Sequence, residues 1–309
     1  MTQTVYNILI NQKSGTVLNI GVEAIESAIE ASGIQVDERV FADPEDMQDQ
    51  LERLSRKSTP LLIGGGDGTL RESAKYLARR KKAFGVLPFG TMNLLAKDLG
   101  LGSLQEALDA YARGSTEDII DAGFVNGEIF LCCASIGTMP KASVFREENR
   151  NESNLLLFPR LFLFVVNHLD KNKRQRIRMT ADGRNLHFRA AAVVVSNNRF
   201  AGETGWTESN FKRASLTSGE LAVYASTTQT STSHLRLLLS LIFGNWLKDP
   251  DLSEIIAKKV SLQTRRRVEL VSIDGEIAEL PTPLVFTLKP KLLHVLIPVP
   301  AQPPVGAPQ

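Results

Sequence analysis

Hydrophobic and polar positions follow two different patterns along this 309-residue chain, and the change falls near residue 122. In the first part, short apolar runs alternate with stretches whose apolar residues recur at helical spacing. The pattern predicts strands at 6–10, 34–41, 61–63 and 84–87, and helices at 17–32, 45–54, 71–81 and 103–112. Alternation of this kind is typical of a parallel sheet covered by helices on both faces.

The second part is typical of antiparallel strands joined by tight turns. Asn126-Gly127 stands between two apolar runs, which is a strong hairpin signal. A turn at 181–184 separates predicted strands at 176–180 and 186–195, and further strands are predicted at 221–225, 268–273 and 284–288. The prolines after residue 298 indicate a disordered tail.

Composition and charge exclude some classes of function. The formal net charge is only +2 and no basic platform is interleaved with aromatic residues, so nucleic-acid binding is not expected. No apolar run approaches the ~20 residues needed to span a bilayer, and the first residues lead straight into a strand, so no signal peptide is expected. The histidines lack metal-ligand spacing and are expected to be structural or surface residues; they are His168, His187, His234 and His294.

Candidate chemistry gathers at three junctions where a predicted strand ends in a polar or glycine-rich loop. In a parallel sheet such ends meet at one edge, which is where open α/β folds bind ligands. Consecutive glycines before a helix let backbone amides approach a phosphate. The residues of the three loops are Asn11, Gln12 and Lys13; Gly64, Gly65, Gly66, Asp67, Gly68 and Thr69; and Gly90, Thr91 and Asn93.

An aspartate inside such a loop needs its own explanation, because its charge would repel phosphate. Asp67 could hold Mg²⁺ through water, orient a glycine turn, or take a proton from an attacking hydroxyl. The residue pattern alone leaves these three roles open.

The order of the motifs resembles the diacylglycerol kinase catalytic-domain superfamily, which includes sphingosine and ceramide kinases and bacterial lipid kinases. The resemblance rests on "NQKSG" at 11–15, "GGGDGT" at 64–69, "PFGTMNLLAKDLG" at 88–100, "IDAGFVNGEIFLCCASIG" at 120–137 and "SIDGE" at 272–276. "GGDGT" alone is ambiguous, because NAD kinases share it and phosphofructokinases carry a close variant. The second loop and the late "DGE" favour lipid kinases.

The resemblance implies a fold and a set of roles. The fold is an N-terminal Rossmann-like domain of the NAD kinase and phosphofructokinase type, followed by an antiparallel β-sandwich. The cofactors are ATP and Mg²⁺, with the phosphates held by amides of 65–69 and by Asn11, Lys13 and Thr91, and with Mg²⁺ near Asp67 or Glu276.

The resemblance leaves two candidates for the catalytic base. In the bacterial branch of the family the aspartate of the late "DGE", here Asp274, is the proposed base, and in the sphingosine kinase branch that role is given to the aspartate of "GGDGT", here Asp67. The length of the chain and the sequences of its motifs resemble the bacterial branch, which favours Asp274 as the base, with Gly275 and Glu276 beside it. Taken without the family, however, Asp-Gly is an ordinary hairpin turn.

Two positions depart from the family. Bacterial relatives often carry an aspartate-rich segment that holds a structural Mg²⁺. In this chain Ser215 and Ser218 stand where the matching carboxylates are expected. Hydroxyls are poor substitutes for carboxylates around a hard cation, so this metal is expected to be absent or weak. Phe41 stands where the family often has a threonine near the nucleotide.

The expectation of a lipid-binding surface rests on the composition of three segments. The most apolar stretch is 155–166, a basic stretch follows at 171–178, and a second apolar segment lies at 235–247. These could form an acyl-chain pocket and a membrane-facing lip, or two core helices and a solvated basic strand. The arginines of 265–267 are expected in a surface turn.

The sequence therefore predicts an ATP- and Mg²⁺-dependent lipid kinase with a nucleotide-binding domain at 1–122, a lipid-binding β-sandwich at 123–298 and a Pro-rich tail at 299–309. The strand near 284–298 could return to the first domain. The expected acceptor is diacylglycerol, ceramide, a sphingoid base or a related glycerolipid, and the expected location is cytoplasmic, peripheral at the inner membrane face. A homodimer, a kinase with a soluble acceptor and a non-catalytic regulator all stay open.

Overall fold

The computed structural model describes residues 4–138, 140, 174–202, 211–227, 230–242 and 245–299. These residues fall into two compact units. Unit 1 comprises Met1–Ile120 with Leu292–Gln309, and unit 2 comprises Asp121–Lys291.

Unit 1 is built on a parallel sheet, as the alternating pattern predicted. Its strands lie in the order β2-β1-β3-β4-β16, and β1 is flanked by parallel partners on both sides. The apolar residues of β3 and β4 are fully buried, as expected for the centre of a sheet that is covered on both faces. The bounds are β1 Val5–Asn11, β2 Gln35–Ala42, β3 Leu61–Gly65, β4 Phe84–Pro88, β5 Ser115–Val125 and β16 Leu284–Pro298.

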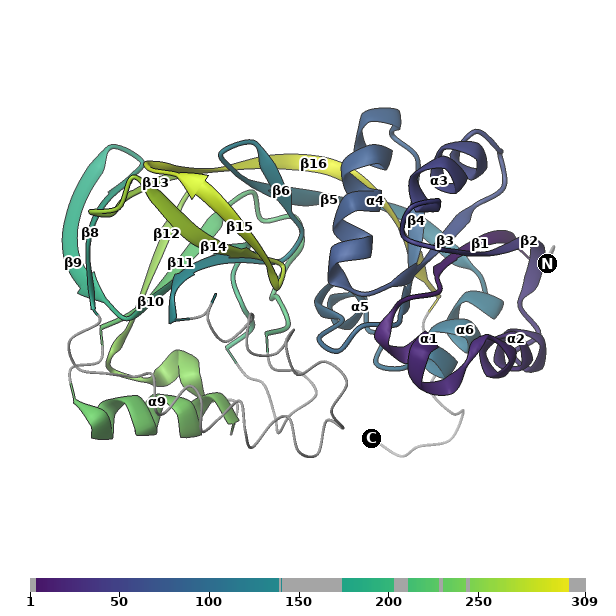
Figure 1. Cartoon of the computed structure of the whole chain (residues 1–309), viewed down its shortest axis with the longest axis horizontal. Helices are drawn as coiled ribbons and strands as arrows, with labels where there is room; N and C mark the ends of the chain where they lie inside the picture. The colour runs from purple at the N-terminus through teal and green to yellow at the C-terminus, as the bar shows by residue number, and fades with distance from the viewer. Residues whose placement is uncertain are drawn as a thin grey trace, which may run out of the picture. The chain divides into compact units, whose positions relative to one another are not determined.

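Helices cover both faces of this sheet. In Figure 1, α3 and α4 lie on one face and α1, α2 and α6 on the other. The bounds are α1 Gly15–Ile20, α2 Val22–Ala31, α3 Met47–Ser55, α4 Asp67–Arg80, α5 Leu94–Asp98 and α6 Leu104–Ala112. Ser103 caps α6 through a capping box with Glu106.

Two helix predictions need correction. The single helix predicted at 17–32 is two helices, because Gly21 at φ +85° ends α1 and begins α2. Only glycine adopts this backbone conformation at little cost, so the apolar periodicity continues across a break that it does not reveal. The helix predicted at 71–81 begins four residues earlier, at Asp67, so the glycine loop itself opens α4.

Tyr111 of α6 fixes that helix to the sheet. Its side chain is fully buried, and its hydroxyl accepts a hydrogen bond from Val86 N (3.0 Å) and donates one to Leu296 O (3.0 Å). Burial raises the pKa of this phenol well above its usual value. A Cβ at Gly85 would lie 2.4 Å from Leu62 Cδ2 and 2.7 Å from the Tyr111 hydroxyl, so the glycine lets the ring approach β4.

Unit 2 is a β-sandwich of two antiparallel sheets. One sheet has the order β12-β11-β10-β7-β14-β15, and in the other the first half of β16 pairs with β13, which pairs with β8, and β8 with β9. The hairpin around Asn126-Gly127 is confirmed by β5 and β6. The bounds are β6 Glu128–Phe130, β7 Cys133–Gly137, β8 Gln175–Ala181, β9 Arg184–Ala190, β10 Ala192–Asn197, β11 Leu221–Ser226, β12 Leu252–Ala257, β13 Lys259–Gln263, β14 Val268–Ile273 and β15 Glu276–Pro281.

The prediction of a single strand at 186–195 is wrong. The segment forms two strands, β9 and β10, which end and begin on either side of Ala191 and belong to different sheets. The apolar residues of both sheets meet in one core, including Met179, Val193 and Phe286. A continuous apolar run can cross from one sheet of a sandwich to the other without any change in its pattern.

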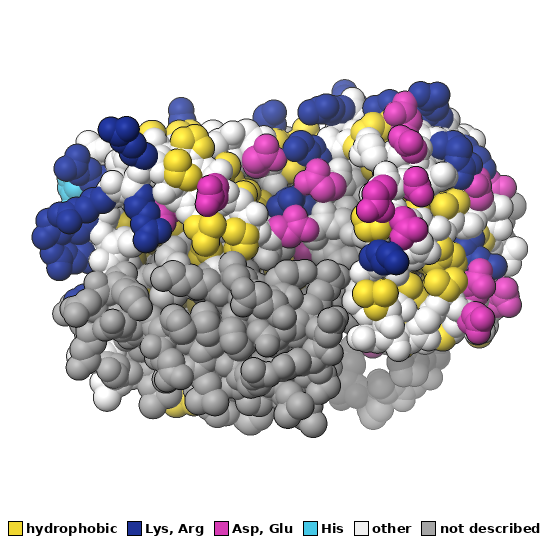
Figure 2. All heavy atoms as spheres, viewed as in Figure 1, with side chains coloured by type: hydrophobic (Ala, Val, Ile, Leu, Met, Phe, Trp, Pro, Cys, Tyr) yellow, Lys and Arg dark blue, Asp and Glu magenta, His cyan; other side chains and the backbone are white. Residues whose placement is uncertain are grey.

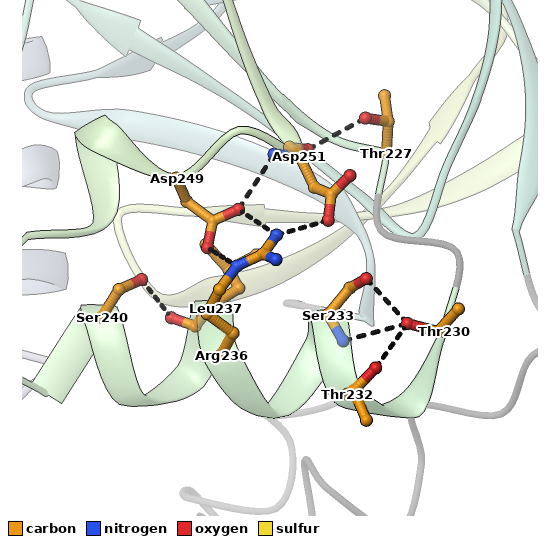
Figure 3. A network of polar contacts seen from close by, with 9 residues as sticks. All are labelled: Thr227, Thr230, Thr232, Ser233, Arg236, Leu237, Ser240, Asp249 and Asp251. Carbon is orange, nitrogen blue, oxygen red and sulfur yellow. Dashed lines mark hydrogen bonds and ion pairs between the residues drawn. The ribbon is translucent and has the colours of Figure 1, made fainter.

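Helix α9, Ser231–Ile242, is tied to the segment before β12 by an ion-pair network. Arg236 points from α9 toward two carboxylates, with Nε 3.0 Å from Asp249 Oδ2 and Nη2 2.6 Å from Asp251 Oδ2 (Figure 3). Arg236 holds the pKa of the buried Asp249 carboxyl below its usual value. Among the helices of the described residues, none is long and apolar enough to cross a membrane.

Candidate functional site

The three loops singled out from the sequence follow adjacent parallel strands. Ile10 of β1 lies opposite Gly64 of β3, and Gly65 of β3 lies opposite Pro88 of β4. The strands therefore end side by side, and the loops after them are brought together at one edge of the unit 1 sheet.

Direct hydrogen bonds join these loops. Asn11 Nδ2 donates to Thr69 Oγ1 (3.0 Å), which connects the first loop to the first turn of α4. Phe89 N donates to Gly65 O (3.1 Å), and Thr16 N donates to Phe89 O (3.1 Å). The three loops thus form one bonded cluster.

The glycines are needed because the backbones approach closely. A Cβ built on Gly90 would lie 2.7 Å from Gly66 Cα, whereas a Cβ on Gly66 would lie 3.4 Å from Gly90 Cα. Side chains on Gly64 and Gly65 would meet the Phe89 ring at 2.7 Å and the Thr69 side chain at 2.5 Å. The tightest backbone contact is therefore at Gly90, a residue in the second loop.

Asp67 makes a contact that supports the orienting role among the three roles that the sequence left open. It is the first residue of α4, and its Oδ1 accepts a hydrogen bond from Leu94 N (2.8 Å) at the start of α5. Asn93, at φ +49°, closes the same loop, since its side chain accepts from Gly90 N (2.7 Å) and donates to Gly90 O (2.7 Å). The carboxylate thus holds the second loop in place against the first.

The first turn of α4 leaves backbone amides that no residue of the same helix can satisfy. Gly68 and Thr69 belong to this turn and are half-buried, and α4 is 14 residues long. The positive end of its dipole and these amides favour an anion at the loop. Gln12 and Lys13 follow Asn11 in the first loop and Thr91 belongs to the second, and the exposed Lys13 Nζ lies 3.7 Å from Asp43 Oδ1.

Asp274 lies in unit 2, in the two-residue turn between β14 and β15. Its backbone is left-handed (φ +48°) and Gly275 follows at φ +92°, so the hairpin interpretation of Asp-Gly is confirmed. The side chain is only 5% exposed, and its carboxylate accepts three backbone hydrogen bonds. The donors are Leu131 N (2.7 Å), Cys132 N (2.9 Å) and Cys133 N (3.0 Å).

A second Asp-Gly turn in unit 2 provides a comparison. Asp182 and Gly183 join β8 to β9 with φ of +46° and +84°, and the exposed Asp182 carboxylate accepts from Lys258 N and Lys259 N. These amides lower the pKa of Asp182. Aspartate in this turn therefore clamps a neighbouring chain segment in both places, but of the two only Asp274 is buried.

The predicted metal ligands differ in what they offer. Asp67 and Glu276 are carboxylates, Glu276 being exposed at the start of β15. Hard cations such as Mg²⁺ prefer oxygen ligands of this kind, so both side chains fit the chemistry of a nucleotide-bound Mg²⁺. In the described ranges no group of three His, Cys, Asp or Glu side chains is arranged to hold a metal ion by itself.

The second-domain metal implied by the family does not fit this chain. Ser218 Oγ hydrogen-bonds to Asn198 Oδ1, and Ser215 Oγ accepts from Thr217 N (3.1 Å). The nearby Asp121 carboxylate accepts from Gly219 N (2.8 Å) and Lys291 N (2.9 Å). The hydroxyls of Ser215 and Ser218 thus bond to other groups of the protein, and hydroxyls are poor substitutes for carboxylates around a hard cation.

Asp121 is a structural residue that the sequence patterns did not predict. It is 1% exposed and lies between Ile120 and Ala122, which are apolar and buried. An aspartate enclosed in a buried apolar run is the signal that could have identified it, because such a carboxylate must find donors inside the protein. The apolar stretch 155–166 lies outside the described residues, and Phe41 is half-buried near the end of β2.

Comparison with known proteins gives the family. The diacylglycerol kinase catalytic domain matches residues 6–123, and the YegS C-terminal NAD kinase beta sandwich-like domain matches residues 142–297. The chain therefore belongs to the bacterial lipid kinase family that joins these two domains. The α/β fold followed by a β-sandwich is confirmed.

Individual relatives agree with this placement. A Pseudomonas aeruginosa protein named "Probable lipid kinase YegS-like" is 38% identical over 100 residues, which is 32% of this chain and 33% of that protein. A Staphylococcus carnosus protein named "Diacylglycerol kinase" is 25% identical over 225 residues, covering 70% of this chain and 69% of the relative. A crystal structure of a diacylglycerol kinase from Bacillus anthracis shares the fold, with a TM-score of 0.68 at 18% identity over 96% of this chain and 97% of that one.

The matches to some curated relatives are partial. The chain spans 55% of the length of a Synechocystis protein and 33% of the Pseudomonas aeruginosa protein.

Proposed function

We propose that this protein is an ATP-dependent lipid kinase that transfers the γ-phosphate to the hydroxyl of a lipid. The observation that carries the proposal is the bonded cluster of three loops, in which a glycine-rich turn opens α4 and a second turn packs against its backbone. Such a turn suits phosphate binding, and the chain belongs to a lipid kinase family.

Unit 1 supplies the phosphate-binding part of the reaction. The amides of 65–69 cradle the phosphates, with Asn11, Lys13 and Thr91 around them. Asp67 keeps the second loop in register by holding Leu94 N. Mg²⁺, when bound with the nucleotide, would neutralise phosphate charge, and either Asp67 or Glu276 is the carboxylate proposed to lie near it.

For the base, Asp274 is the first candidate and Asp67 the alternative. Three backbone amides fix the orientation of the Asp274 carboxylate, which suits a group that must meet one acceptor hydroxyl. The same bonds make Asp274 a structural residue, so loss of turnover in a variant is evidence for a base only if the fold is intact.

The acceptor is proposed to be diacylglycerol, ceramide, a sphingoid base or a related glycerolipid, reached at the inner face of the membrane. The names of the relatives support a lipid acceptor. The exposed arginines of 265–267 support contact with anionic headgroups.

The test is transfer of label from γ-labelled ATP to a panel of these lipids in mixed micelles, with NAD as the soluble acceptor in a parallel reaction. Label in one lipid class and none in NAD supports the proposal and names the acceptor. Label in NAD instead would favour a kinase with a soluble acceptor over the lipid kinase. ATP binding without any transfer would favour a non-catalytic regulator.

A further inference from the structure

A cavity of about 260 Å³ opens at the edge of the unit 2 sandwich, among residues that take no part in the proposed phosphoryl transfer. Its lining comes from the start of β8, the end of β9 and the loop between β13 and β14. Five of its lining residues are arginines, namely Arg174, Arg176, Arg189, Arg265 and Arg266. Figure 2 shows Lys and Arg side chains gathered over β8 and β9, at the left of the view.

Strand register forces two of these arginines together. Arg176 of β8 lies directly opposite Arg189 of β9 in the antiparallel ladder, and both side chains are exposed on the outer face of the hairpin. Like charges directly opposite each other destabilise a sheet. An anion between them would turn this repulsion into attraction.

The negative charge beside the cavity is small compared with the positive charge that lines it. Glu269 is 1% exposed and accepts hydrogen bonds from Thr264 Oγ1 (2.8 Å), Gln175 Nε2 (3.2 Å) and Arg266 Nη1 (3.3 Å). This carboxylate offsets one guanidinium and fixes its position. In the part of the chain that the structure describes, no ion pair joins Glu269 or any other acid to the remaining four arginines of the lining.

We propose that this cavity is a second anion site, which binds the phosphate group of a phosphate ester. Guanidinium groups donate paired N–H bonds whose geometry matches phosphate oxygens, and several of them converging on one space suit a doubly charged group. The phosphate belongs either to a free ester or to a lipid headgroup. The site lies wholly in unit 2 and does not depend on the nucleotide loops of unit 1.

The test compares two double variants of the same hairpin. Arg176→Gln with Arg189→Gln removes the facing pair, and Arg178→Gln with Arg184→Gln removes the same charge from exposed positions that do not line the cavity. Glycerol 3-phosphate is titrated calorimetrically into each protein without ATP, because nucleotide phosphates would compete for the same arginines. Vesicles of phosphatidylglycerol are compared with vesicles of phosphatidylcholine by co-sedimentation.

The expected result is a loss of affinity of roughly tenfold or more in the cavity variant and less than about twofold in the control. Binding of glycerol 3-phosphate would identify a free ester as sufficient, whereas binding only to phosphatidylglycerol vesicles would identify a lipid headgroup. Equal losses in the two variants would show bulk charge attraction, and binding of neither probe by the unmodified protein would also overturn the proposal.

Folding is not expected to confound this test, because the substituted side chains are exposed. At low salt the cavity variant should melt at or above the temperature of the unmodified protein, since the repulsion between Arg176 and Arg189 is removed. If it melts lower, the single variant Arg265→Gln, in the loop, provides the binding comparison.

Discussion

Replacement of Asp274 by asparagine separates a catalytic role from a structural one. Asparagine keeps the size of the side chain and tolerates the left-handed backbone at φ +48° as well as aspartate does. The substitution therefore changes only the hydrogen bonds and the charge. An amide has one oxygen, whereas the Asp274 carboxylate uses both of its oxygens to accept bonds.

The loss of stability expected for Asp274→Asn follows from these contacts. If the amide oxygen keeps the bonds from Cys132 N and Cys133 N, the amide nitrogen faces Leu131 N, and two donors stand 2.7 Å apart. One buried N–H then loses its partner, and the other two bonds lose their charged acceptor. The expected destabilisation is about 3 kcal/mol, which corresponds to a fall in Tm of roughly 6–12 °C for a unit of this size.

The assay is thermal unfolding of the Asp274→Asn protein beside an Asp182→Asn control. The control makes the same substitution in the same type of turn, where water can replace the lost bonds, so its Tm should change by less than about 2 °C. Turnover is then measured well below the Tm of each variant. A rate loss there beyond about a hundredfold assigns the base to Asp274.

Equal melting temperatures for the Asp274→Asn and unmodified proteins would refute the structural role of the Asp274 hydrogen bonds to the 131–133 amides. If the variant is destabilised but keeps turnover at low temperature, Asp274 is structural only and Asp67 becomes the base.

Three further changes test the rest of the account. Tyr111→Phe removes the hydroxyl that satisfies two buried backbone groups and should cost about 1–3 kcal/mol, measured by urea unfolding with an unchanged m-value. Arg236→Gln should lower Tm at pH 7, and because Arg236 depresses the pKa of Asp249, the difference from the unmodified protein should fade below about pH 4; a difference independent of pH would contradict the ion pair. Gly90→Ala should weaken ATP binding, because its Cβ would lie 2.7 Å from Gly66 Cα. In Gly66→Ala the Cβ would lie 3.4 Å from Gly90 Cα, so this variant should bind ATP within about threefold of the unmodified protein. Equal ATP affinities of the two variants in calorimetry would contradict the close approach.

Much of the fold could be predicted because its signals are local. Apolar runs of strand length, the Asn126-Gly127 turn and the Ser103 cap each act through neighbouring residues. The errors came where two structures share one pattern. Apolar residues keep helical spacing across Gly21, and a continuous apolar run hides the passage from one sheet to the other at Ala191.

The candidate site could be predicted only in part. Glycine-rich loops after parallel strands are visible in the sequence, and the register of β1, β3 and β4 brings them together. The contacts of Asp67 with Leu94 N and of Asp274 with the 131–133 amides could not be predicted, because they join residues far apart in the chain. The cross-strand pairing of Arg176 with Arg189 likewise depends on a register that no single strand specifies.

The measurement that tests the central claim most directly is transfer of the γ-phosphate to a lipid hydroxyl, with Gly90→Ala and Gly66→Ala as the matched pair. Labelled phospholipid is expected with the unmodified protein and with Gly66→Ala, and little is expected with Gly90→Ala at the same ATP concentration. Labelled lipid formed equally well by both glycine variants would contradict the loop assignment. Bound ATP with no labelled lipid would contradict the kinase itself.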